Sequence, residues 1–176
     1  MKRLLILRHA KAVPADATGD DATRDLNPRG HADAARLGAW LAAHNMAPAH
    51  ILCSPAHRTR QTFEDVSQAL GRSPKATFPE SLYLASVRTL LAEARKTVDS
   101  AQSLMLVGHN PGLENLALHL VRKPKTEAQK KHLRAMAEGF PTCALAVLDF
   151  DVENWKQLAA ASADIVVYIR PKDLSS

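Results

Sequence analysis

Aromatic residues are scarce in this chain, at 5% of 176 residues, so any core must rest mainly on Leu, Val, Ile and Ala. The only two cysteines, Cys53 and Cys143, are too few and too widely separated for a disulfide framework or a zinc site. No apolar run approaches the roughly 20 residues that cross a bilayer. The apolar start at residues 4–7 breaks at Arg8, which makes it too short for a signal peptide. These absences favour a reduced, cytoplasmic protein with no membrane partner.

Metal-ligand spacing is also missing from the sequence. The eight histidines form no pattern such as HExxH, so we expect no metal and no cofactor. Charge, by contrast, is unbalanced, with a formal net charge of +5. A basic chain suits anionic partners, but this value does not choose among nucleic acid, acidic protein and phosphorylated metabolite.

Short apolar segments alternate along the chain with amphipathic helical patterns. This alternation predicts a single α/β domain over residues 1–176, built as a three-layer α/β/α sandwich with a mostly parallel central sheet. Residues 12–29, rich in Asp, Thr, Pro and Gly, are expected to form a long loop. We expect strands at 4–7, 51–53, 104–107, 144–150 and 163–169. Helices are expected from 28, at 54–70, at 86–98, at 111–120 and from 126, where Thr126 and Gln129 have capping-box spacing.

Polar residues follow each of the first three expected strands. Arg8 and His9 come directly after the first, residues 54–58 (SPAHR) after the second, and residues 108–112 (GHNPG) after the third. In an open α/β sheet the carboxyl ends of the strands line one crevice, where ligands bind. We therefore expect two arginines and two histidines to converge there from distant parts of the chain.

Phosphate is the anion that best suits this set of side chains. The guanidinium groups of Arg8 and Arg58 match phosphate oxygens with paired donors. Phosphoryl transfer needs an in-line nucleophile, which His9 would supply, and fixed positive charge, to which a protonated His109 would add. A helix N-terminus after Asn110 adds a favourable potential for an anion. The cluster predicts phosphate chemistry that needs no metal.

These segments resemble the motifs of the histidine phosphatase superfamily (branch 1, phosphoglycerate mutase-like). Residues 7–10 (LRHA) are similar to the family signature, 53–62 (CSPAHRTRQT) to its second motif, and 107–112 (VGHNPG) to its third. Residues 24–30 (RDLNPRG) fit the loop before the family's first long helix. The pattern is most similar to the short SixA-type phosphohistidine phosphatases of bacteria, and the resemblance covers nearly the whole chain.

The resemblance implies a phosphoglycerate mutase-like fold and a role for each residue of the cluster. His9 would be the nucleophile and carry the phosphoryl group as phosphohistidine. Arg8, Arg58 and His109 would hold the phosphate, with Asn110 beside them. An acidic proton donor is kept by the wider family roughly where Glu80 stands here, which makes Glu80 the candidate general acid.

The chain departs from phosphoglycerate mutases directly after His9. Their longer signature has Gly and then a Glu-Ser pair after the histidine, whereas residues 10–12 here are Ala-Lys-Ala. This departure argues against mutase activity and favours a phosphohistidine protein as the substrate. A small-molecule phosphomonoesterase with the same pocket is one alternative. A non-catalytic phosphate or phosphoprotein binding module is another, although pure binding needs only the arginines and not the pair of His9 and His109.

Two further patterns invite other functions. Cys53 does not begin the Cys-x5-Arg loop of tyrosine phosphatases, because the position that requires Arg holds Thr59. The basic stretch 122–134 is typical of a solvated helix face, and a docking patch for an acidic phosphoprotein is the alternative. Nucleic acid is not expected there, because no aromatic residue interleaves with the lysines to stack on bases.

Overall fold

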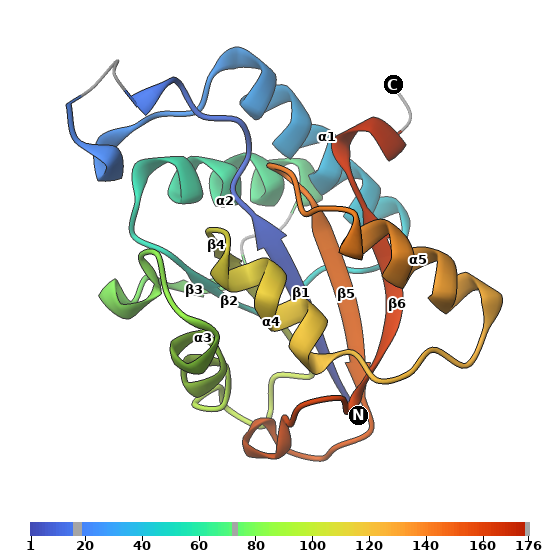
Figure 1. Ribbon diagram of the computed structural model, residues 1–176. Helices are drawn as coiled ribbons and strands as arrows, with labels where there is room; N and C mark the ends of the chain where they lie inside the picture. Colours follow the sequence, from blue (N-terminus) through green and yellow to red (C-terminus); the bar gives the residue numbers. More distant parts are fainter. Residues whose placement is uncertain (16–18, 72–73, 175–176) are drawn as a thin grey trace.

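One six-stranded sheet lies at the centre of the computed structural model, which describes residues 1–15, 19–71 and 74–174 (Figure 1). Its strands are β1 (Lys2–Arg8), β2 (His50–Cys53), β3 (Lys75–Thr77), β4 (Ser103–Gly108), β5 (Leu145–Phe150) and β6 (Ala163–Ile169). They lie in the order β3-β2-β4-β1-β5-β6. The first four of these pair in parallel, whereas β5 is antiparallel to both β1 and β6. The predicted mostly parallel sheet is confirmed.

Helices cover both faces of this sheet (Figure 1). The described α-helices are α1 (Pro28–Ala43), α2 (His57–Leu70), α3 (Val87–Ala94), α4 (Gly112–Leu120) and α5 (Glu127–Ala137). Side chains of α1 and α2 pack with one face of the strands, and side chains of α3, α4 and α5 pack with the other. The predicted three-layer α/β/α sandwich is therefore confirmed.

The sequence of β1 shows why it lies in the middle of the sheet. Its four apolar residues are fully buried, and alternate side chains of a strand point to opposite faces. Leu4 and Ile6 pack on the side of α3, α4 and α5, whereas Leu5 and Leu7 pack on the side of α1 and α2. A continuous apolar run is the pattern of a parallel strand that is covered on both faces.

Two predicted helix starts agree with the structure. The Asn27 side chain accepts a hydrogen bond from the Gly30 amide at the head of α1, and Pro28 occupies the first helical position. Thr126 and Gln129 form the predicted capping box of α5. These caps satisfy backbone N–H groups that would otherwise lack an intrahelical partner.

Other boundaries differ from the sequence prediction. Helix α2 begins at His57 and not at residue 54, because the Ser54 amide still pairs with the Val107 carbonyl at the end of the sheet (2.9 Å). The helix predicted at 86–98 ends at Ala94. Strand β3 was not predicted, since three residues on a half-exposed edge carry no recognisable alternation. Residues 16–18 of the predicted loop lie outside the described residues.

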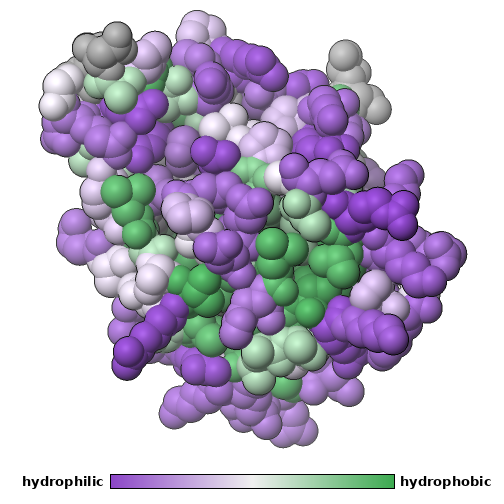
Figure 2. Space-filling view, in the orientation of Figure 1, coloured by the Kyte–Doolittle hydropathy of each residue, from purple (hydrophilic) through white to green (hydrophobic). Residues whose placement is uncertain are grey.

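The surface carries two features of interest for binding. Figure 2 shows a largely hydrophilic face with an apolar area over α4, and Leu118 of this helix is 37% exposed. In the basic stretch 122–134, Arg122 pairs with Asp164 and Lys130 pairs with Glu127, so part of its charge is neutralised within the protein. Docking of a partner on this stretch stays a prediction. No described helix is both long enough and apolar enough to cross a bilayer.

A glycine at the head of α1 allows the chain after β1 to pass close to the helix. A Cβ atom on Gly30 would lie 2.2 Å from the Lys11 carbonyl oxygen, which also accepts a hydrogen bond from the Asn27 amide. We therefore expect Gly30→Ala to lower the free energy of unfolding by about 1–3 kcal/mol, measured by chemical denaturation. Ala35→Ser, on the exposed side of the same helix, should change it by less than about 0.5 kcal/mol. An unchanged stability of Gly30→Ala would show that this close approach is not a constraint.

Candidate active site

The carboxyl ends of three neighbouring strands, β2, β4 and β1, lie side by side. Arg8 at the end of β1 is in register with Gly108 at the end of β4. The amide of His9 donates to the Gly108 carbonyl (3.0 Å), which brings His9 close to His109, the residue after Gly108. The rings of His9 and His109 have centroids 5.4 Å apart. Parallel pairing in this register thus assembles the two predicted histidines.

Helix α2 brings Arg58 to the same place from its first turn. Its side chain is only 3% exposed. The hydroxyl of Thr62 donates to the Arg58 carbonyl (2.6 Å) and accepts from the amide of Ala10 (2.9 Å), which ties the helix to the residue after His9. The Thr62 hydroxyl therefore links the backbone of Arg58 to the backbone of Ala10, the residue next to His9.

These residues line a cavity of about 390 Å³. Five predicted residues take part in its wall: Arg8, His9, Arg58, His109 and Asn110. Further lining comes from Lys11, Ala12, Asp21, Arg24, Leu84 and Thr142.

Glu80 is not among the residues that line this cavity. It is exposed, at the start of a short 3-10 turn over Glu80–Leu82. Its backbone carbonyl accepts a hydrogen bond from the amide of Tyr83 (3.1 Å), so Glu80 contributes to the placement of that ring. Its part as a general acid stays a prediction.

His9 is held in one tautomer by its neighbour. Its Nδ1 lies 2.7 Å from the backbone carbonyl of Ala10, and because a carbonyl only accepts, Nδ1 carries the proton. Burial, with the charges of Arg58 and Arg8, lowers the pKa of His9 to about 4. His9 is therefore neutral at pH 7, with a lone pair on Nε2.

His109 is held in the opposite tautomer. The Arg58 guanidinium only donates, so Nδ1 of His109, 3.3 Å from its Nη2, accepts. The Nε2 proton of His109 is then donated to the Ser54 hydroxyl (2.7 Å). Burial, together with the neighbouring His9 and Arg58, lowers the pKa of His109 to about 3. The protonated His109 that we expected from the sequence would thus require a nearby anion to stabilise its charge.

Arg8 and Asn110 share an anchor on the loop before β5. Arg8 Nη1 donates to the Phe140 carbonyl (2.8 Å), and the Asn110 amide group donates to the same oxygen (3.0 Å) and to Glu114 (2.9 Å). Within the described part of the chain, Arg8 Nε and Asn110 Oδ1 are buried and have no hydrogen-bond partner. Both side chains therefore keep unused hydrogen-bonding capacity at the cavity wall.

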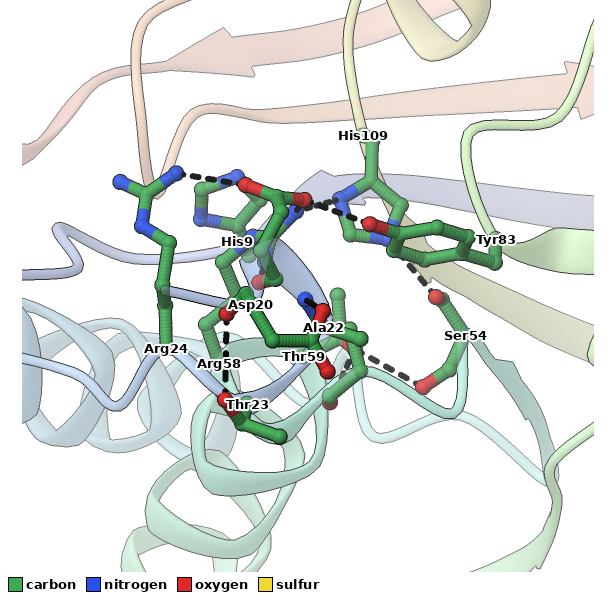
Figure 3. A network of polar contacts seen from close by, with 12 residues as sticks. His9, Asp20, Ala22, Thr23, Arg24, Ser54, Arg58, Thr59, Tyr83 and His109 are labelled. Atoms are coloured by element: carbon green, nitrogen blue, oxygen red, sulfur yellow. Dashed lines mark hydrogen bonds and ion pairs between the residues drawn. The ribbon is translucent and has the colours of Figure 1, made fainter. Parts of the chain in front are cut away.

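Asp21 supplies the acidic side chain of the described cavity wall, and Figure 3 labels the three residues that donate to it, Arg24, Arg58 and Tyr83. It belongs to a 3-10 turn over Asp21–Thr23. Its carboxylate accepts from the Tyr83 hydroxyl (2.6 Å), Arg24 (2.8 Å) and Arg58 (2.8 Å). These three donors lower the pKa of Asp21 far below its ordinary value, so this carboxylate is ionised. The site thus combines neutral histidines, guanidinium groups and one tightly held carboxylate.

Known proteins share this sequence pattern and this fold. Residues 4–82 match the model of the histidine phosphatase superfamily (branch 1). A protein of Mycobacterium tuberculosis is 33% identical over 94% of this chain and 100% of its own length. The structure assigned as phosphohistidine phosphatase SixA from Agrobacterium tumefaciens is 31% identical, with a TM-score of 0.77, covering 97% of this chain and 98% of that one. The chain belongs to the histidine phosphatase superfamily.

A second solved structure supports the SixA type within this superfamily. It is assigned as phosphohistidine phosphatase SixA from Nakamurella multipartitia, with 30% identity and a TM-score of 0.79. The match covers 97% of this chain and 96% of that chain. The prediction that this chain is of the SixA type is therefore confirmed, and so is the prediction that it is a phosphatase.

The sequence did not predict that four further residues take part in the hydrogen-bond network of the candidate site: Ser54, Tyr83, Asp21 and Arg24. Ser54 was interpreted as a helix start, but its hydroxyl contacts His109. Asp21 and Arg24 lie three residues apart in a loop, where no periodic pattern marks a contact with α2. The one available signal was the excess of Asp and Arg in a loop next to a motif with phosphate-binding character.

Among the residues that the structure describes, no group of three or more His, Cys, Asp or Glu side chains has the arrangement to hold a metal ion. The buried thiols of Cys53 and Cys143 have a raised pKa because of desolvation, so they are poor nucleophiles.

The protonation of the two histidines can be measured by nitrogen NMR. Because their pKa values are lowered to about 4 for His9 and about 3 for His109, both imidazoles should be neutral at pH 6. The unfolded chain binds more protons than the folded one between about pH 6.5 and pH 4, so the free energy of unfolding should decrease as the pH falls through that window. Titration of either ring near pH 6.5 in the folded protein would contradict this description.

Proposed function

We propose that this protein is a metal-independent phosphohistidine phosphatase that acts through a phosphohistidine intermediate on His9. The observation that carries the proposal is the neutral His9 imidazole, whose Nδ1 is bound to the Ala10 carbonyl and whose Nε2 keeps its lone pair. A nucleophile must be unprotonated at its attacking atom, and this environment provides that at neutral pH. Similarity to the two SixA structures, at 30% and 31% identity, supports the same activity.

The reaction has two steps. In the first, Nε2 of His9 attacks the phosphorus atom, and the bond from phosphorus to the substrate's imidazole nitrogen breaks. That nitrogen keeps the electron pair and takes up a proton from solvent. In the second step a water oxygen attacks the phosphorus, and the bond to His9 breaks with its electron pair returning to Nε2. One proton of that water returns to solvent, and inorganic phosphate leaves. No metal or cofactor is needed to balance either step.

Positive charge around the transferred group comes from three residues. Arg8 and Arg58 present guanidinium donors to the phosphoryl oxygens, whose charge is spread in the transition state. His109 offers Nδ1, which takes up a proton when a phosphoryl dianion approaches, because a nearby negative charge raises an imidazole pKa. Asn110 adds a neutral polar group at the same wall.

The acidic groups near the site support a phosphohistidine substrate over an ester. Asp21 is ionised and holds three donors, so it has no proton to give to a leaving oxygen. Glu80 is exposed and outside the cavity lining. An alkoxide leaves poorly without an acid, whereas an imidazole is easily protonated near neutral pH. A site with a weak proton donor therefore favours cleavage of the P–N bond.

The surroundings of the cavity suit a phosphorylated protein. A second cavity of about 560 Å³ adjoins the first, and Arg8, Asn110 and Thr142 line both. Its lining also includes Arg29, at the start of α1, and residues 170–172. A phosphohistidine side chain comes with a segment of polypeptide, for which this second cavity provides room next to the site. A small phosphorylated metabolite is the alternative substrate.

The covalent role of His9 is testable by substitution. His9→Ala should reduce turnover by at least about 10³-fold and abolish an acid-labile, base-stable phosphoryl adduct, because no other group replaces the nucleophile. His57→Ala is a matched control, since this exposed histidine lies in the same motif and pairs with Asp25 outside the cavity. Rapid quenching with labelled substrate measures both properties. Adduct formation by His9→Ala at the normal rate would refute the mechanism.

Substrate preference provides an independent test. The unmodified enzyme should hydrolyse a phosphohistidine protein with a kcat/KM at least about 100-fold above that for an alkyl phosphate, in line with the usual contribution of a general acid. Glu80→Gln should leave phosphohistidine hydrolysis within about threefold, with any larger loss confined to esters. A preference for alkyl esters, or equal losses on both substrates, would favour the metabolite phosphatase.

A further inference from the structure

Arg58, which the proposed function assigns to the phosphate, is already engaged by an acidic residue of the same chain. Its Nη2 donates to the Asp21 carboxylate (2.8 Å) and its Nη1 donates to the Asp21 backbone carbonyl. The Arg58 side chain is only 3% exposed, and its Nε is buried without a partner among the described residues. The two Nη atoms are therefore the part of the guanidinium through which Arg58 meets an anion, and Asp21 accepts hydrogen bonds from both.

The carboxylate of Asp21 is fixed in this place by two more donors. The Tyr83 hydroxyl donates to the same oxygen as Arg58 (2.6 Å), and Arg24 donates to the other oxygen (2.8 Å). Arg24 is itself anchored, because its guanidinium donates to the Val13 carbonyl. In Figure 3, Arg24 lies on one side of this network and Tyr83 and His109 lie on the other.

The position of Asp21 matches what a phosphoryl oxygen would need. Nη2 of Arg58 lies between the Asp21 carboxylate and Nδ1 of His109, which is 3.3 Å away. A phosphoryl group bound to His9 in the proposed reaction would present its oxygens to these same donors. Two anions that share one partly buried guanidinium repel each other, so the phosphoryl group and the Asp21 carboxylate cannot both hold Arg58 at full strength.

We propose that Asp21 is a built-in carboxylate ligand of the phosphate site, which a phosphoryl group displaces from Arg58. Asp21 thereby sets the affinity of the site for phosphate and favours a doubly charged phosphoryl group over singly charged anions that form fewer hydrogen bonds. The same exchange weakens the hold on inorganic phosphate, the product. This inference rests on the proposed phosphate role of Arg58.

The direct test is the binding of inorganic phosphate to the full chain, measured by calorimetry. Asp21→Asn should lower the Kd for phosphate by about tenfold, since removing one competing charge-assisted hydrogen bond is worth about that factor. Asp25→Asn is the matched control, with the same change of charge in the same loop. Asp25 is exposed, pairs with His57 and Gln61, and does not line the cavity, so its Kd should change by less than about twofold.

A second variant shows whether Asp21 competes with phosphate for Arg58 or holds Arg58 in place for phosphate. Tyr83→Phe removes one donor to Asp21 without any change of charge, so it should lower the Kd for phosphate in the same direction, by about threefold. If Asp21 instead holds Arg58 in place for phosphate, both variants will raise the Kd, and the proposal is overturned. An unchanged Kd in Asp21→Asn overturns it as well.

The outcome is distinguishable from a failure of the proposed function. Phosphate binding is measured without turnover, so tighter binding by Asp21→Asn supports the inference even if no phosphohistidine substrate is cleaved. In turnover, the inhibition constant for product phosphate should fall by the same factor as the Kd. A lower Kd with an unchanged inhibition constant would show that phosphate binds away from the reacting site and would overturn the proposal.

Discussion

The parallel pairing of β1 with β4 is the constraint on which the site depends. It places Arg8 beside Gly108 and joins the His9 amide to the Gly108 carbonyl, so that two histidines far apart in sequence share one cavity. A shift of register by one residue would turn each side chain of β1 to the opposite face of the sheet, against different core neighbours, and would separate Arg8 from Gly108. The burial of the apolar side chains of β1 favours this one register, and the register in turn fixes the position of His9 beside His109. The same strand pairing therefore serves both the stability of the core and the placement of the proposed nucleophile.

Burial of the two imidazoles has an electrostatic consequence. Removal from water, next to guanidinium groups, favours their neutral forms. The Ala10 carbonyl holds the tautomer of His9, and the Arg58 guanidinium, with the Ser54 hydroxyl, holds the tautomer of His109. Neutrality suits a nucleophile, and an approaching dianion supplies the charge that makes the second imidazole a donor. Among the described residues that line the cavity, Asp21 is the only carboxylate, and its hydrogen bond with Arg58 offsets part of the positive charge of the cavity.

Much of this arrangement could be predicted from the sequence, because strand cores and strand ends leave local signals. The apolar run before Arg8 and the polar residues at 54–58 and 108–112 were enough to place the cavity at one edge of the sheet. Contacts made by loops left no such signal. The interaction of Asp21 with Arg58 depends on how the loop crosses the first turn of α2, which no periodicity encodes. For the same reason an acidic residue was expected at Glu80, by resemblance, whereas the cavity wall holds Asp21.

The most direct test of the central claim is a crystal structure of the protein with vanadate, a mimic of the transferred phosphoryl group. The account predicts a covalent bond from Nε2 of His9 to vanadium in a trigonal-bipyramidal arrangement. The equatorial oxygens should contact Arg8, Arg58 and His109, and the Asp21 carboxylate should be withdrawn from Arg58. Vanadate bound through another residue, or bound in this cavity with no bond to His9, would contradict the assignment of His9 as the nucleophile.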